Sequence, residues 1–305
     1  MERKITQKLM EWKSNPERRP LIITGCRQIG KTFSIKEFVS SEYRSYMYIN
    51  FEIQPDKKDL FKGNCSADEL ISRLILSENI RMYPGESAIV LDEIQACTEA
   101  YSALKPLSED RRFDVICSGS FLGINLDDDD DRLSPLGYAK IVQMTPMDFE
   151  EYLWAMGINK DLISDVRARV QDLERVDDYF HQAFTKHFRT YMVVGGMPAA
   201  VKTYAETKDY VKTSDVLQDI ISILKKDTGK YSRKAGRTKI NKCLDSIPRQ
   251  LSKENKRFVY SDVEKKKGVG RKTYGSALDW LKEAGLISLC NNLTEPNKPL
   301  SSKVV

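Results

Sequence analysis

The first half of the chain alternates between two patterns of hydrophobic and polar positions. Stretches with apolar residues at helical spacing occur at 3–13, 33–39 and 66–75. Short apolar runs lie between and after them, at residues 21–23, 45–51, 88–91, 113–117 and 141–144. These runs predict strands, because each is followed by glycine or polar residues. Strands that alternate with helices predict an α/β fold with a doubly wound parallel sheet, with ligands at the carboxyl ends of the strands.

The second half of the chain has a different pattern. Residues 160–232 are helical in pattern, with a break at 195–198 where the sequence is Gly-Gly-Met-Pro. Beyond residue 236 the pattern predicts a helix at 240–251, a strand at 258–260, a helix opening at 261–262, a helix at 271–284 and a strand at 286–289. Three helices with a strand after the third are typical of a winged helix. We therefore expect a sheet domain (1–155), a helical lid (156–235) and a winged-helix-like domain (236–292).

The segment after the first predicted strand carries a defined motif. Residues 25–32 read G-C-R-Q-I-G-K-T and fit the P-loop pattern G-x-x-x-x-G-K-[ST], with a strand before it and a helix after it. Its glycines let the backbone wrap a phosphate, Lys31 adds a point charge, and Thr32 offers a hydroxyl to Mg²⁺. An ordinary glycine turn is the alternative interpretation, which the flanking elements disfavour. The expected nucleotide-binding residues are Gly25, Cys26, Arg27, Gln28, Ile29, Gly30, Lys31, Thr32 and Phe33.

A later strand ends in two carboxylates, Asp92 and Glu93. Asp92 would hold Mg²⁺ through water and Glu93 would polarise the attacking water, because phosphoryl transfer depends on positioning and charge neutralisation. Such an acidic pair is otherwise typical of a turn, and the upstream P-loop favours the catalytic interpretation. Ser118 and Ser120, at the end of the next strand, could contact a γ-phosphate or form a plain turn. The candidate catalytic residues are therefore Lys31 and Glu93.

The composition is that of a globular protein in water. Apolar residues make up 41% and charged residues 30%, and no apolar run approaches the length of a membrane span. The charged start, Met-Glu-Arg-Lys, is not followed by an apolar segment, so we expect no secretory signal. The six cysteines are far apart and form no C-x-x-C pair, which is typical of reduced thiols rather than disulfides or a zinc site. We expect a soluble, cytoplasmic protein with no membrane partner.

Positive charge is concentrated in residues 236–292. This segment holds thirteen Lys and Arg against six Asp and Glu, a net charge of +7, whereas the whole chain carries +5. Lys265, Lys266, Lys267, Arg271 and Lys272 lie near the start of the predicted third helix, where they could contact DNA phosphates. The alternatives are a protein interface and a solvated face. Duplex DNA and a partner protein both stay open as partners.

Two further features favour a structural interpretation. His181 and His187 lie in one helical stretch, where a solvated or half-buried role is favoured over catalysis or metal binding. Residues 127–131 are five consecutive aspartates, which fit a self-repelling solvated loop better than an additional metal site.

Five motifs jointly resemble a family of prokaryotic AAA-type ATPases. They are G-C-R-Q-I-G-K-T at 25–32, L-D-E-I-Q at 91–95, S-G-S at 118–120, T-P-M-D-F-E-E-Y-L at 145–153 and V-V-G-G-M-P-A-A-V at 193–201. The resemblance covers about residues 1–300 and implies an ASCE-type P-loop NTPase sheet that binds ATP and Mg²⁺. It implies that Lys31 and Thr32 contact phosphate and Mg²⁺, that Asp92 contacts Mg²⁺ and that Glu93 contacts the water. It also implies a polar sensor at Ser118 or Ser120, with Gln95 completing the family's D-E-I-Q.

The chain departs from the family pattern in two places. Many relatives have an arginine in a G-R pair before the last strand, where this chain has Gly137-Tyr138. Arg132 is the nearest substitute for this finger, and a neighbouring subunit of an oligomer could also supply it. Relatives also continue, beyond the position of Val305, into a carboxyl-terminal domain of unknown function with restriction-endonuclease-like ancestry. Residues 293–305 are therefore expected to be the start of a truncated domain, without nuclease activity.

Two functions of different class follow from the sequence. In the first, the protein is an Mg²⁺-dependent ATP hydrolase that acts as a nucleotide-driven switch coupled to a DNA- or protein-binding domain. In the second, it is a nucleotide-stabilised binding module with negligible turnover. The missing finger arginine favours the second, because such a residue contributes roughly 10³ to 10⁵ in rate where it is used. The intact Asp92-Glu93 pair favours the first, since a pure binder has no need of the second carboxylate.

Overall fold

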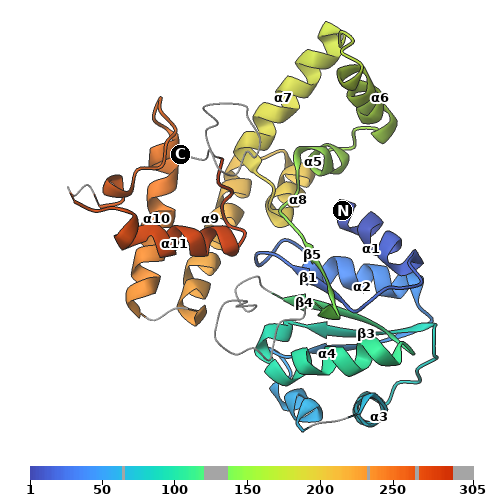
Figure 1. Cartoon of the computed structure of the whole chain (residues 1–305). Helices are drawn as coiled ribbons and strands as arrows, with labels where there is room; N and C mark the ends of the chain where they lie inside the picture. Colours follow the sequence, from blue (N-terminus) through green and yellow to red (C-terminus); the bar gives the residue numbers. More distant parts are fainter. Residues whose placement is uncertain (64–65, 120–136, 232–233, 265–267, 291–305) are drawn as a thin grey trace. The chain divides into compact units, whose positions relative to one another are not determined.

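The apolar runs of the first half of the chain pair into one parallel, five-stranded sheet (Figure 1). Its strands are β1 (Leu21–Thr24), β2 (Ser45–Asn50), β3 (Ser87–Asp92), β4 (Asp114–Gly119) and β5 (Lys140–Gln143). Their order across the sheet is β2-β3-β4-β1-β5. All neighbours are parallel, so the carboxyl ends of the strands lie at one edge, as the alternating pattern predicts. This computed structural model describes residues 1–63, 66–119, 137–231, 234–264 and 268–290.

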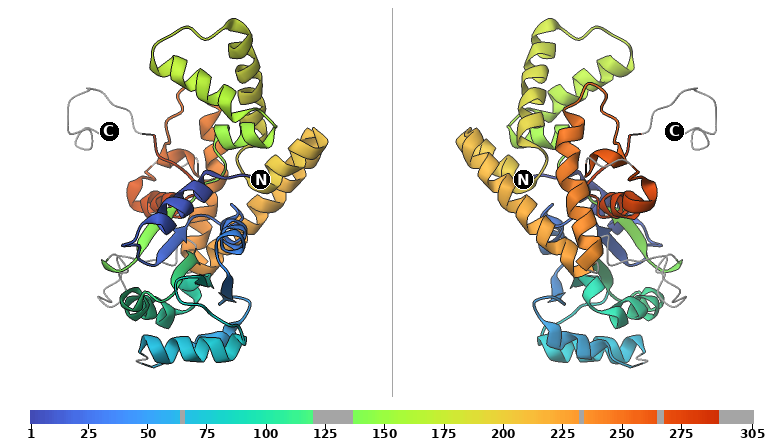
Figure 2. Two further views of the ribbon diagram at one scale, coloured as in Figure 1. Left: turned by 90° about the vertical axis from the view of Figure 1, so that its right-hand side faces the viewer. Right: turned by 90° about the vertical axis from the view of Figure 1, so that its left-hand side faces the viewer.

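Helices cover both faces of this sheet, as Figures 1 and 2 show. One face carries α1 (Lys4–Ser14) and α2 (Lys31–Glu42), and the other carries α3 (Ala67–Glu78) and α4 (Thr98–Asp110). The core between the sheet and α3 and α4 also takes in a 3₁₀ helix, η1 (Pro55–Phe61). Every residue of β3 is buried, which is why this strand reads as a continuous apolar run rather than an alternating one. The α/β fold class is thereby confirmed.

The strand order decides which loops meet at the carboxyl edge. β4 lies between β1 and β3, so the segment after β1 and the acidic end of β3 lie on either side of the end of β4. The register places Thr24 opposite Gly119, and Asn50 opposite Asp92. The ends of four neighbouring strands therefore stop at nearly the same level, and their polar end residues are brought together.

A run of helices follows the sheet. They are α5 (Phe149–Ala155), α6 (Lys160–Gln171), α7 (Asp178–Val194), α8 (Pro198–Thr207) and α9 (Tyr210–Tyr231). The break predicted at 195–198 separates α7 from α8 and packs against the turn before α5. There the Met147 N–H donates to Gly196 O at 2.7 Å, and a Cβ on Gly196 would lie 2.2 Å from Met147 O. Only glycine permits this approach at position 196, while the preceding Gly195 has a positive φ of +73°, which glycine adopts without strain.

The chain divides into two compact units, Met1–Lys226 and Asp227–Val305. The core of the second unit is formed by α10 (Lys234–Leu251) and α11 (Arg271–Glu283), with Cys243, Tyr274 and Leu281 buried between them. Both helices were predicted. The helix expected to open at 261–262 is only a short 3₁₀ turn, η5 (Tyr260–Asp262).

The two strands of the expected winged helix are not formed in the described part of this unit. Residues 258–260 and 286–289 carry the apolar pattern of strands, but neither segment pairs with another described segment. An isolated extended segment gains no ladder of hydrogen bonds. The Val259 N–H instead donates to the side chain of Gln250 at 2.6 Å, and Phe258 packs against the ring of Tyr260. The winged-helix layout is therefore not confirmed.

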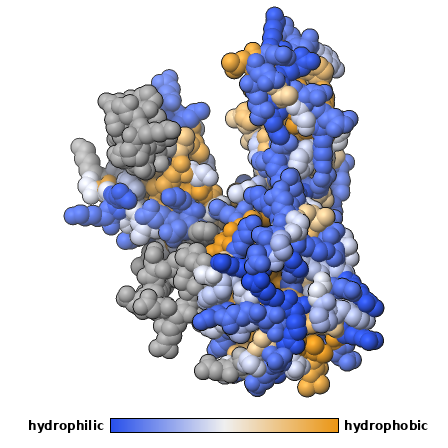
Figure 3. Space-filling model, turned by 45° about the vertical axis from the view of Figure 1, so that its right-hand side comes forward, coloured by the Kyte–Doolittle hydropathy of each residue, from blue (hydrophilic) through white to orange (hydrophobic). Residues whose placement is uncertain are grey.

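On the face that Figure 3 shows, apolar residues form small groups separated by polar ones. Highly exposed apolar side chains include Leu76 in α3, Leu173 after α6, and the adjacent Met192 and Val193 in α7. Among the described residues, no helix is long and apolar enough to cross a membrane.

Candidate functional site

The P-loop of residues 25–32 connects the end of β1 to the start of α2. Its backbone turns through left-handed conformations at Gln28 (φ +65°) and Gly30 (φ +90°). Successive N–H groups in such a turn make a concave site for an anion at the amino end of a helix. Gly25 is required for a different reason, because a Cβ there would lie 2.2 Å from Met144 O at the end of β5. The sequence motif therefore has the backbone geometry that phosphate binding needs.

Lys31 is the first residue of α2 and is 6% exposed. Its ammonium donates to the carbonyls of Gly25 and Cys26, each at 2.9 Å. Burial lowers the pKa of Lys31, and the nearby carboxylate of Glu93 partly opposes that shift. The P-loop carbonyls thus fix the position of this ammonium, and Glu93 at the end of the acidic strand favours its charged form.

The carboxylate of Asp92 is the point where the P-loop and the acidic strand meet. It is 1% exposed, and its Oδ2 accepts a hydrogen bond from Thr32 Oγ1 at 2.9 Å. The same oxygen accepts from Tyr48 Oη at 2.6 Å and from Asn50 Nδ2 at 3.0 Å, while Ser118 donates to the other oxygen. Four donors from three elements, α2, β2 and β4, compensate the burial of this charge. The structure thus brings together three of the predicted site residues, Asp92, Thr32 and Ser118.

Tyr48 and Asn50 were not predicted as site residues. Both lie on β2, the edge strand next to β3, and the register pairs Asn50 directly with Asp92. Burial and the hydrogen bond to the Asp92 carboxylate raise the pKa of Tyr48, because both disfavour a second negative charge. The polar residue at the end of a predicted strand was a signal for Asn50. Tyr48 gave no such signal, because its ring is typical of strand interiors.

Glu93 follows Asp92 in a left-handed backbone conformation, with φ +54°. This conformation is uncommon for a residue with a Cβ and turns the chain sharply out of β3. Its N–H donates to Ser118 Oγ at 3.4 Å, and its carboxylate accepts a hydrogen bond from Gln95. The amide of Gln95 in turn lies so close to β4 that a Cβ on Gly119 would be 2.9 Å from Gln95 Oε1. The direction of the Glu93 carboxylate is therefore fixed by its neighbours.

The side chains of Thr32 and Asp92 could hold a magnesium ion. Both present oxygen atoms, the ligands that Mg²⁺ prefers, and they converge beside the P-loop from two different elements. A cation here would also partly neutralise the buried carboxylate. The donor set therefore fits the ion that the resemblance implies.

The other predicted residues are distributed more widely. Phe33 in α2 is 58% exposed, and Arg27 forms an ion pair with Glu52 at 2.6 Å. Arg271 and Lys272 are exposed in the first turn of α11, in the second compact unit. The remaining predictions lie outside the described residues, namely Ser120, Arg132, the aspartates at 127–131, Lys265, Lys266, Lys267 and the segment 293–305.

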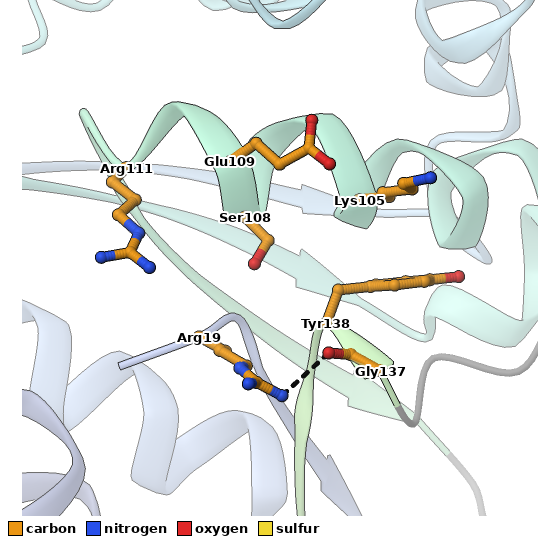
Figure 4. A pocket seen from close by; sticks show the side chains of 7 residues that line it. All are labelled: Arg19, Lys105, Ser108, Glu109, Arg111, Gly137 and Tyr138. Carbon is orange, nitrogen blue, oxygen red and sulfur yellow. Dashed lines mark hydrogen bonds between the residues drawn. The ribbon is translucent and has the colours of Figure 1, made fainter. Parts of the chain in front are cut away.

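A pocket of about 580 Å³ lies at the other end of the sheet from the P-loop (Figure 4). It is lined by Arg19, Lys105, Ser108, Glu109, Arg111, Gly137 and Tyr138. Arg19 precedes β1 and Tyr138 precedes β5, so the pocket lies at the amino ends of these strands. Its position and its lining show that it is not part of the P-loop site.

Two family models match the chain. Residues 17–153 match the AAA domain, and residues 185–305 match a domain of unknown function, DUF8612. The second match begins within α7, well before the carboxyl-terminal region where the resemblance placed a domain of unknown function. The restriction-endonuclease-like ancestry that the resemblance implies for the carboxyl-terminal domain stays a prediction. No curated protein matches the chain.

Several solved structures are similar at low levels. The ORC1 protein of Aeropyrum pernix, in complex with DNA, is 12% identical over 96% of this chain and 84% of its own, with a TM-score of 0.35. AMPPCP-bound DnaA from Aquifex aeolicus is 13% identical over 93% and 88%, with a TM-score of 0.41. RuvB of Thermotoga maritima, a Holliday junction branch migration motor, is 12% identical over 95% and 90%, with a TM-score of 0.40. TM-scores below 0.5 are too low to transfer function. The part of the chain that is similar to the AAA domain, residues 17–153, is the part that forms the P-loop and the five-stranded parallel sheet.

Proposed function

We propose that the chain binds Mg²⁺-ATP and hydrolyses it, and that it acts as a nucleotide-driven switch. One observation carries this proposal: the P-loop threonine and the strand-end aspartate, 60 residues apart in the sequence, are in direct hydrogen-bond contact at 2.9 Å. Lys31 and Glu93 are their immediate neighbours in the chain. The two halves of a phosphate and metal site are therefore assembled at one edge of the sheet.

Each residue of the site has a chemical role in this proposal. The P-loop N–H groups and Lys31 bind the phosphates and stabilise the charge that moves onto them. Thr32 and Asp92 would hold Mg²⁺, which when bound neutralises phosphate charge. Glu93 orients and polarises the attacking water, and Gln95 sets the direction of its carboxylate. Ser118 contacts both Asp92 and the Glu93 backbone, so it is placed to report changes at the site.

The second part of the proposal concerns what the switch acts on. Residues 236–292 carry a net charge of +7, and Arg271 and Lys272 are exposed at the start of α11. A concentration of positive charge attracts nucleic acid phosphates in a salt-dependent way. We propose duplex DNA as the ligand of this unit. If the chain binds no DNA, a partner protein is the alternative ligand.

The test is Mg²⁺-dependent ATP hydrolysis by the purified chain, together with ATP binding followed by the melting temperature. We expect Glu93→Gln to keep ATP binding but to lose turnover by roughly 10² to 10⁴, the usual contribution of a positioned acid or base. Lys31→Ala should weaken binding itself. Glu109→Gln, an exposed carboxylate on α4, is the matched control and should behave like the unchanged protein.

Two outcomes would contradict the switch. Equal turnover by the unchanged chain and by Glu93→Gln would remove the catalytic role of that carboxylate. Absence of turnover, combined with stabilisation by ATP of about 2.7 kcal/mol at 100 times its Kd, would instead show a nucleotide-bound binding module. Turnover per chain that rises with protein concentration would indicate that a neighbouring subunit supplies the finger.

A further inference from the structure

Arg3, just before α1, is a buried arginine that bridges distant parts of the first unit. It is 7% exposed, and its Nε donates to Glu151 Oε1 at 3.1 Å. One terminal nitrogen donates to Ile29 O in the P-loop at 2.7 Å, and the other donates to Thr145 O before α5 at 2.6 Å. Each nitrogen of the guanidinium therefore bonds a different segment, and the planar fork fixes the three acceptors relative to one another.

Glu151 connects this arginine to the start of α5. It is 4% exposed and belongs to a capping box, in which Asp148 accepts from the Glu151 N–H and Glu151 accepts from the Asp148 N–H. The same carboxylate accepts from the Lys4 N–H at 2.6 Å. Because Glu151 helps to begin α5, a displacement of its carboxylate would also loosen the first turn of that helix. The position of Arg3 and the start of α5 are thus coupled.

The contact with Ile29 matters for phosphate binding. A P-loop binds an anion with N–H groups that point toward it, so the orientation of each peptide group in the loop matters. Arg3 donates to Ile29 O and so fixes the direction of this carbonyl and of the peptide group that it shares with Gly30. At the start of the same loop, Gly25 lies closely against Met144 O. Both ends of the loop are therefore tied to the segment that connects β5 to α5.

We propose that Arg3 is a positioning residue that holds the P-loop in its phosphate-binding shape and couples it to α5, the first helix after the sheet. The expected effect of Arg3 on nucleotide binding rests on the proposed function, whereas its effect on the shape of the P-loop does not. A change in the P-loop alters the position of Ile29 O, and Arg3 transmits this change to Glu151 and the start of α5. Movement of α5 alters the loop by the same contacts, since coupling between two sites is reciprocal.

The test compares Arg3→Gln and Arg3→Lys with Lys4→Gln. Lys4 makes ion pairs with Asp148 and Glu150 at 2.6 Å each, so it ties the same end of the chain to α5 without bonding the P-loop. We expect Arg3→Gln to speed amide hydrogen exchange in both the P-loop and α5, and Lys4→Gln to speed it in α5 alone. Arg3→Lys, which keeps the charge but not the fork, should lie between Arg3→Gln and the unchanged chain.

The second readout is ATP. We expect Arg3→Gln to raise the Kd and the KM for ATP about tenfold, or 1.4 kcal/mol, with a smaller change in kcat. Lys4→Gln should keep the Kd of the unchanged chain. If Arg3 only stabilises the fold, both variants should have a lower melting temperature and an unchanged Kd for ATP. That result would overturn the proposal. If Arg3→Gln does not fold, Arg3→Lys with unchanged P-loop exchange would overturn it as well. If the unchanged chain binds no ATP, the proposed function fails, while the exchange data still decide the role of Arg3.

Discussion

The P-loop site and the basic unit at the carboxyl-terminal end present charge in opposite ways. Asp92 is buried and accepts hydrogen bonds from four residues on three elements, so the position of each donor depends on the same carboxylate. Arg271 and Lys272 are exposed on one helix turn. A buried charge requires partners at defined positions, whereas exposed charges act mainly through a screened field. Substitutions should therefore have large, position-specific effects in the first region and small, additive effects in the second.

The largest effect is expected from Gly25→Ala. The added Cβ would lie 2.2 Å from Met144 O, and the backbone φ of +151° is unfavourable for alanine. We expect loss of detectable ATP binding and destabilisation of more than about 1 kcal/mol, measured by melting with and without ATP. Gly137→Ala, where no atom lies within 4 Å of the added Cβ, is the control. Normal ATP binding by Gly25→Ala would show that the loop tolerates this displacement.

Asp92→Asn tests the centre of the buried network. The amide cannot accept from all of the donors that now point at the carboxylate, and it lacks the charge that binds Mg²⁺. We expect Mg²⁺-dependent turnover to fall about 100-fold, a loss of roughly 2.7 kcal/mol of transition-state stabilisation. Asp165→Asn, an exposed residue of α6, should leave turnover unchanged. A loss of less than twofold at Asp92 would contradict its assignment as a metal ligand.

Tyr48→Phe removes one of the four donors and should have a moderate effect. Phenylalanine keeps the ring, and with it the contact of Lys36, whose ammonium lies 3.7 Å from the ring centroid. We expect turnover to fall about fivefold, the equivalent of one hydrogen bond of about 1 kcal/mol. Tyr46→Phe, on the same strand but with an exposed hydroxyl contact to Ser40, is the matched control. Equal turnover in both variants would mean that Tyr48 has no role in positioning Asp92.

The smallest effect is expected at the exposed pair. Changing both Arg271 and Lys272 to alanine should weaken duplex DNA binding only several-fold, while the slope of log K against log salt falls by roughly 2. Filter or fluorescence binding at several salt concentrations measures both quantities. Lys282→Ala, in the last turn of the same helix, is the control. If DNA does not bind at all, the basic charge serves a partner protein or only solvation.

The two regions also differ in how much of them could be predicted from the sequence. The P-loop motif, the acidic strand and Ser118 were predicted together, because strand ends in a parallel sheet meet at one edge. Tyr48 was not predicted, since no local pattern shows that its strand is the neighbour of β3. Arg3 was not predicted either, because its partners Ile29, Thr145 and Glu151 are far away in the sequence. In the described part of the second unit, the predicted strands have no partners, and two of the three expected helices, α10 and α11, formed.

The sequence by itself determined the local features of this protein. The P-loop glycines, the apolar runs of the strands and the break at 195–198 are visible in the local sequence, and the Asp148 capping box joins residues three positions apart. The contacts that require Gly25 and Gly196 are with Met144 O and Met147 O, which are far away in the chain. The tertiary structure decided which strands are neighbours, and hence which side chains surround Asp92 and where the guanidinium of Arg3 bonds. The physical reason is that periodicity records whether a residue is buried, but not which residue covers it. That pairing depends on the packing of the whole sheet.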